Sequence, residues 1–101
     1  MYVRVNANDT DVTKQVEKVM QFYLTSVTSD LESIAVSIDD VSDRLGANLK
    51  RCTVCGLLVA GDAVEVVETQ ADLMLAVTRA MDRCVRTVRR RRSLQRFSRS
   101  A

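Results

Sequence analysis

The sequence predicts an α+β fold in which four strands form one sheet and two helices pack on one face of it. Two stretches of the 101-residue chain repeat apolar residues at the i, i+3, i+4 spacing of an amphipathic helix. Four other stretches are rich in β-forming residues or alternate apolar and polar ones, as strands do. Their order is strand, helix, three strands, helix (β-α-β-β-β-α), which indicates an antiparallel meander whose sheet the first strand also joins.

The first strand is expected at residues 1–6, where Val3 and Val5 lie on one face. A helix is expected over 14–27, with Thr13 as the N-cap residue that accepts a hydrogen bond from an amide of the first turn. Its apolar positions then follow at helical spacing: Val16, Val19, Met20, Tyr23 and Val27.

Three strands are expected next, at residues 33–39, 50–60 and 63–68, and the last two form a hairpin around a Gly-Asp turn. Between the first two of them, a polar stretch predicts a loop of about ten residues. Its acidic residues do not have the spacing of a calcium-binding EF-hand loop, so no metal site is predicted there.

The closing helix is expected over 72–92, with Asp72 in the first turn, where a carboxylate suits the helix dipole. After Arg92 the periodicity is lost. We therefore expect a single domain at 1–92 and a basic, disordered tail at 93–101.

The closing helix is amphipathic, with one apolar and one basic stripe. The apolar stripe is Leu73, Val77, Ala80, Met81, Cys84 and Val88, and the basic stripe is Arg79, Arg83, Arg86 and Arg90.

Charge is distributed unevenly along the chain. The formal net charge is +2, but residues 1–78 hold six basic and twelve acidic side chains, whereas residues 79–101 hold nine arginines and one acidic side chain. An acidic body with a basic terminal helix is the electrostatic pattern expected of a protein that docks on phosphate. A solvated basic tail without a specific partner is the alternative.

Several classes of function are disfavoured. The chain has no histidine, the usual general base for Ser or Cys nucleophiles, and no Gly-rich phosphate-binding loop, so we predict neither an enzyme nor a cofactor or small-molecule substrate. It shows no signal-peptide pattern and no apolar run long enough to cross a membrane, so a cytoplasmic location and no membrane partner are expected.

The Cys52-Thr-Val-Cys55 motif predicts neither a metal nor a redox site. A structural zinc site needs four ligands, and a strand places residues three apart on opposite faces. A redox CxxC belongs at a helix N-terminus, where the thiol pKa is lowered. We therefore expect Cys52 to be a small core residue and Cys55 to be exposed or half-exposed.

The arginine stripe carries the functional prediction. Arginines at helical spacing repel one another unless counterions or phosphates lie near, and guanidinium groups suit bidentate phosphate contacts. With 4% aromatic residues and no base-reading motif, the expected partner is RNA, recognised by its backbone and shape.

The order and spacing of four segments resemble the ribosome hibernation-promoting factor family, also described as the sigma-54 modulation or ribosome-associated inhibitor family. The segments are MYVRVNANDTDVTKQV, IAVSIDD, KRCTVCGLLVAG and ADLMLAVTRAMDRCVRTVRR, and the resemblance extends to about Arg92. The chain is similar to the short form of the family, which lacks the C-terminal dimerisation domain. One departure is Lys14, which stands where the family usually has a proline.

The resemblance implies a fold like that of double-stranded-RNA-binding domains and a non-catalytic cytosolic protein. Such a protein binds rRNA of the small ribosomal subunit, modulates translation and holds ribosomes in hibernation. The positions that match the family's basic surfaces are Lys14, Lys18, Lys50, Arg51, Arg79, Arg83, Arg86, Arg89 and Arg90.

Two further hypotheses stay open. The chain could be a protein-interaction module that has lost ribosome binding, in which the basic helix meets an acidic partner. It could also form a homodimer through an exposed sheet face or edge strand.

Overall fold

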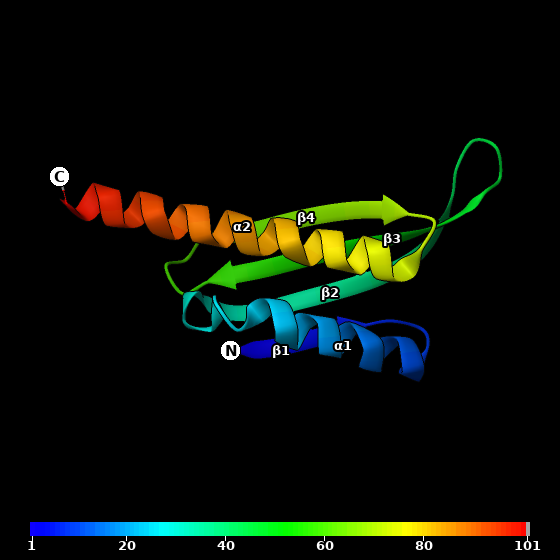
Figure 1. Cartoon of the computed structure of the whole chain (residues 1–101), viewed down its shortest axis with the longest axis horizontal. Helices are drawn as coiled ribbons and strands as arrows, with labels where there is room; N and C mark the ends of the chain where they lie inside the picture. The colour runs from blue at the N-terminus through cyan, green and yellow to red at the C-terminus, as the bar shows by residue number, and fades with distance from the viewer. Residues whose placement is uncertain (101) are drawn as a thin grey trace.

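The structure is a computed structural model that describes the backbone of residues 1–100 and the side chains of residues 1–94. It confirms the predicted α+β fold and the order of its elements (Figure 1). The elements are β1 (Tyr2–Asn6), α1 (Thr10–Leu24), the short 3-10 helix η1 (Thr28–Asp30), β2 (Leu31–Ser42), β3 (Asn48–Leu58), β4 (Ala63–Gln70) and α2 (Leu73–Ser100).

The four strands form one mixed sheet in the order β1-β2-β3-β4. β1 pairs with β2 in parallel, because α1 carries the chain back along the sheet between them, whereas hairpins make the other two pairings antiparallel. β1 and β4 are therefore the two edge strands.

Both helices cover the same face of the sheet and run in the same direction (Figure 1). α2 packs on β3 and β4, while α1 packs beside α2 and over β1. In β2, Ile34 and Val36 point toward the helices, and in β3, Cys52 and Val54 do so. The core lies between these strand residues and the apolar stripes of the two helices, and the other face of the sheet is uncovered.

The predicted N-cap of α1 is wrong. Asp9 caps the helix instead, with its Oδ1 accepting a hydrogen bond from the Asp11 amide at 2.8 Å. Thr13 lies one turn inside the helix, and its hydroxyl donates to the Asp9 carbonyl. The helix therefore begins four residues earlier than expected, because Asp is as good a capping residue as Thr and stands at the first position that fits.

The ten-residue loop predicted after the second strand is also mostly wrong, because β2 and β3 continue as a two-stranded arm (Figure 1). The pairing extends to Ser42 and Asn48, and only residues 43–47 form the turn. In that turn the Asp43 carboxylate accepts hydrogen bonds from two backbone amides, and Gly46 has a φ of 82°. Polar residues continue as strands here because the side chains of the arm are exposed or half-buried rather than part of the core, so no apolar alternation is needed.

The helix end predicted at Arg92 is wrong, because α2 continues in regular conformation to Ser100. No glycine or proline interrupts residues 93–100, so nothing local stops the helix. The side chains of residues 95–100, and residue 101 altogether, lie outside the described residues. The division into a domain at 1–92 and a disordered tail thus stays a prediction.

Candidate nucleic-acid interface

α2 presents its arginines on the side that faces away from the core. Val77, Ala80, Met81, Cys84 and Val88 are all buried, as predicted, and Leu73 packs against them half-buried. The opposite side of the helix carries four exposed arginines, which we call the basic row. The basic row is Arg79, Arg83, Arg86 and Arg90.

α1 adds two cations to the same outer surface. Lys14 and Lys18 are exposed and lie one turn apart, opposite the buried Val16 and Met20. Because α1 and α2 lie side by side over the sheet, the outward sides of both helices form one surface of the molecule (Figure 1). We call the basic row together with Arg89, Lys14 and Lys18 the helical basic surface.

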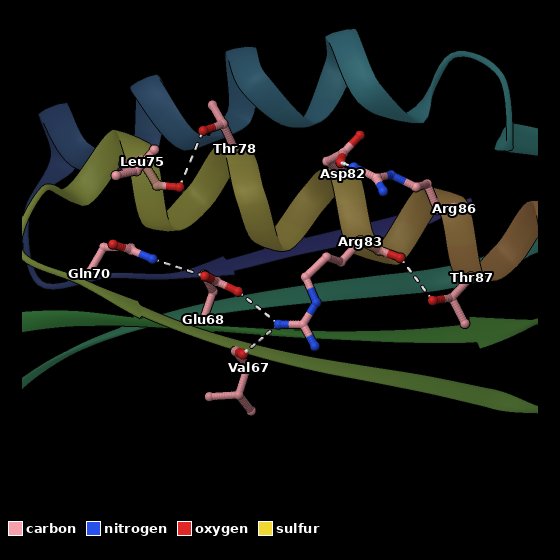
Figure 2. A network of polar contacts seen from close by, with 9 residues as sticks. All are labelled: Val67, Glu68, Gln70, Leu75, Thr78, Asp82, Arg83, Arg86 and Thr87. Atoms are coloured by element: carbon pink, nitrogen blue, oxygen red, sulfur yellow. Dashed lines mark hydrogen bonds and ion pairs between the residues drawn. The ribbon is translucent and has the colours of Figure 1, made fainter.

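Arg83 forms hydrogen bonds with two residues of β4, as Figure 2 shows. Its Nη1 donates to Glu68 Oε2 at 2.7 Å and to the Val67 carbonyl at 3.2 Å. Gln70 donates to the other oxygen of Glu68 at 3.0 Å. The hydrogen bonds from Gln70 and then Arg83 hold the pKa of Glu68 below its ordinary value. Glu68 on β4 therefore neutralises part of the positive charge of Arg83.

Arg86 is paired with Asp82, one turn earlier on α2 (Figure 2). The hydrogen bond with Asp82 raises the pKa of Arg86. The two side chains are 70% and 40% exposed, so water screens the pair and Arg86 is able to turn toward another anion at low cost.

Arg89 donates to the Ser26 hydroxyl just after α1, at 2.6 Å. In contrast, Arg79 and Arg90 have neither an ion pair nor a side-chain hydrogen bond with any residue whose side chain is described. Among the described side chains, three of the five arginines predicted on this helix thus have a protein partner, and the other two have their donors available for an external anion.

The structure separates Lys50 and Arg51 from the basic row. Lys50 lies on the helix side of β3 and forms an ion pair with Asp40 on β2. Arg51 lies on the uncovered face of the sheet, with its Nη2 3.8 Å from Asp39 Oδ2. Consecutive residues of a strand point to opposite faces, so Lys50 and Arg51 cannot contribute to the same binding surface.

Two arginines beyond the predicted set have a clear structural position. Arg92 donates to Asp30 and to the Ser26 carbonyl, and Arg91 donates to the Ala63 carbonyl at 3.1 Å. Arg92 thus attaches α2 to the connection between α1 and β2, and Arg91 attaches α2 to β4. Sequence alone gave no sign of this, because nothing local distinguishes these two arginines from their neighbours.

The cysteines occupy the positions that strand geometry predicts. Cys52 is buried beneath the helices and Cys55 is exposed on the other face, where its thiol lies 3.7 Å from Glu65 Oε2. Burial, and then the charge and hydrogen bonding of Glu65, raise the pKa of Cys55 and keep the thiol protonated. No group of three metal-ligating side chains occurs within the described part of the chain.

Neither helix, as far as the structure describes it, is long and apolar enough to span a membrane.

No protein-family model matches the chain, and no curated protein sequence matches it. Solved structures are similar to it. The crystal structure of the Thermus thermophilus Protein Y N-terminal domain has a TM-score of 0.66 and 26% sequence identity, over 89% of this chain and 96% of that chain. The structure of a ribosomal subunit interface protein from Coxiella burnetii has a TM-score of 0.70 and 11% identity, over 92% of this chain and 99% of that chain.

The fold and its surface thus define a small β-α-β-β-β-α domain with an outward row of arginines on α2. The structure matches the ribosome hibernation-promoting factor family, as the sequence resemblance predicted. The likeness to the Coxiella protein is one of fold alone, because the sequence identity is low.

Proposed function

We propose that this protein is a non-catalytic, ribosome-associated factor that binds rRNA of the small subunit through the helical basic surface. In that role it modulates translation or holds ribosomes in hibernation, and it acts in the cytoplasm. The observation that carries the proposal is the outward row of arginines on α2 in a domain whose fold matches ribosome-associated proteins.

The proposed contacts are to phosphate. Arg79 and Arg90 are separated by three helical turns, about 16 Å along the axis, so they reach different phosphates of one backbone. Arg86 and Arg89 would exchange exposed contacts with Asp82 and Ser26 for contacts with phosphate. Lys14 and Lys18 extend the surface across α1.

Two of the sequence-predicted residues have smaller parts in this proposal. Lys50 lies near the starts of both helices, close to Asp9 and Leu73, and its charge is balanced by Asp40. Arg51 lies on the uncovered sheet face, so we leave it outside the proposed RNA contact.

Sedimentation with purified small ribosomal subunits tests the proposal. The wild type should co-sediment at low salt and dissociate as salt rises, because phosphate contacts release counterions. The variant Arg79→Gln/Arg90→Gln should lose most of this binding. A matched control, Arg44→Gln/Arg51→Gln, removes two exposed charges from the arm and should bind as the wild type does.

A wild type that stays at the top of the gradient at low salt would overturn the proposal. Equal losses in both double variants would show that only net charge matters and would overturn the proposed surface. A complex that survives nuclease treatment would favour the alternative, in which the basic helix meets an acidic protein.

A further inference from the structure

The two edge strands of the sheet, β4 and β1, differ in how far side chains of other elements cover their outer backbone groups. On β4, the Leu58 amide donates to the Asp62 carbonyl at 2.7 Å, which identifies 62, 64 and 66 as the positions bonded to β3. The carbonyls of Ala63 and Val67 therefore point outward from the edge. Arg91 and Arg83 of α2 donate to these two carbonyls, at 3.1 and 3.2 Å.

These two arginines block β4 against pairing with another strand. A new strand would need the carbonyls that the guanidinium groups already occupy, and it would meet two cationic side chains at the edge. Charged side chains that cover an edge are a common protection against unwanted pairing.

β1 has no such protection from any residue whose side chain is described. Across residues 1–94, no side chain forms a hydrogen bond with β1, and its backbone pairing is with β2 alone. Tyr2 is 71% exposed and Val3 is 44% exposed. A largely apolar groove of about 470 Å³ runs beside the strand against α1, with Met1, Val3, Met20 and Leu24 among its lining residues.

From this contrast we propose that β1 pairs with β1 of a second copy of the chain, in antiparallel orientation and centred on Val3. This surface is separate from the helical basic surface.

The sequence of β1 complements itself in this register. Val3 faces Val3 of the other copy on the helix side, which places apolar side chains over the two grooves. Tyr2 then faces Arg4 of the other copy on the uncovered side, where a guanidinium can stack on an aromatic ring. A register centred on Arg4 would place two arginines opposite each other, and like charges in that position repel.

A strand from a different protein is a less suitable partner for β1. Arg4 is the one charged side chain on β1, and β1 of a second copy supplies an aromatic residue for it at the opposing position. Antiparallel pairing about an axis perpendicular to the sheet also keeps both pairs of helices on the same side. The two basic rows would then face the same direction.

Sedimentation equilibrium over a wide range of concentrations tests the pairing. The mass of the wild type should rise from that of the 11.3 kDa chain toward twice that value. Val3→Lys places two charges at the axis and should remain a monomer. Val67→Lys is the matched control, because Val67 is a 45% exposed valine on the blocked edge, and it should associate as the wild type does.

Cross-linking tests the register. In a Cys55→Ser background, Val3→Cys should form an intermolecular disulfide under mild oxidation, several-fold more than Arg4→Cys does. A wild type that is monomeric throughout, or a Val67→Lys variant that dissociates like Val3→Lys, would overturn the proposal. A stronger cross-link from Arg4→Cys would overturn the register centred on Val3.

Discussion

Arg92 of α2 and Asp30 of η1 form an ion pair across 62 positions of the sequence. Arg92 Nε donates to Asp30 Oδ1 at 3.0 Å, and Nη2 donates to Oδ2 and to the Ser26 carbonyl. The hydrogen bond with Asp30 raises the pKa of Arg92. The two side chains are only 30% and 22% exposed, so this pair holds α2 against the connection between α1 and β2.

Asp30→Asn should lower the urea midpoint of unfolding, because it leaves the guanidinium with a neutral and weaker acceptor. The control is Asp62→Asn, which removes the partner of Arg91 at 3.3 Å; there the carboxylate is 65% exposed and water already screens the pair. The loss should be larger for Asp30→Asn. Equal midpoints for the two variants would contradict a structural role for the Arg92–Asp30 pair.

Stability should fall in alkaline solution because of the two buried thiols. Burial, and then the charge of Glu68, raise the pKa of Cys52 from 9.0 to about 12, and burial chiefly raises that of Cys84 to about 11. Above pH 9 the unfolded chain loses these protons while the folded chain keeps them. The free energy of unfolding should therefore decrease by up to about 1.4 kcal/mol per pH unit for each thiol.

Urea unfolding of the wild type and of Cys52→Ala/Cys84→Ala at several pH values from about 8 to about 10.5 measures this effect. Other groups titrate equally in both proteins, so the difference between the two pH slopes isolates the thiols. Parallel slopes would show that the buried thiols ionise as readily in the folded protein as in the unfolded chain.

Met81→Ala should destabilise the fold by about 2–5 kcal/mol, because the side chain is fully buried between α2 and the sheet and its removal leaves a cavity. Leu45→Ala, at the tip of the arm where the leucine is 94% exposed, should change stability by less than about 0.5 kcal/mol. Thermal and urea unfolding of both variants provide the measurement. Similar effects at the two positions would be inconsistent with the described core.

The arginines of the basic row should differ in their effect on the salt dependence of the proposed ribosome binding. Arg79→Gln or Arg90→Gln should each reduce the slope of log K against log salt by about 1, the effect of one lost phosphate contact. Arg83→Gln should reduce it less, because Glu68 already neutralises part of the Arg83 charge. Titrations at several salt concentrations give the slopes, and three equal reductions would argue against this ranking.

Strand and helix periodicity predicted the fold class because each element has one buried side. The Val/Ile alternation around Ile34 and the helical spacing around Met81 are both local patterns, and both side chains are buried as expected. The same dependence on a buried side explains why the arm of β2 and β3 was not predicted. Residues such as Asp40 and Lys50 pair across the two strands outside the core, so no apolar alternation marks them as strand residues.

The basic face of α2 was predictable from sequence, since helical spacing alone aligns its arginines on one side. Which of them have protein partners was not. Glu68, Asp30 and Ser26 come from other elements of the chain, and their contacts with Arg83, Arg92 and Arg89 exist only once the sheet and helices are packed.

The sequence by itself determined the order of elements, the core stripe and the outward basic row, because these depend on the period of a helix or strand. The tertiary structure alone decided the rest. It divided the arginines between those held by acidic groups and hydroxyls and those left to solvent, and it covered β4 while leaving β1 open. Those outcomes depend on distances between residues far apart in sequence, which no local pattern contains.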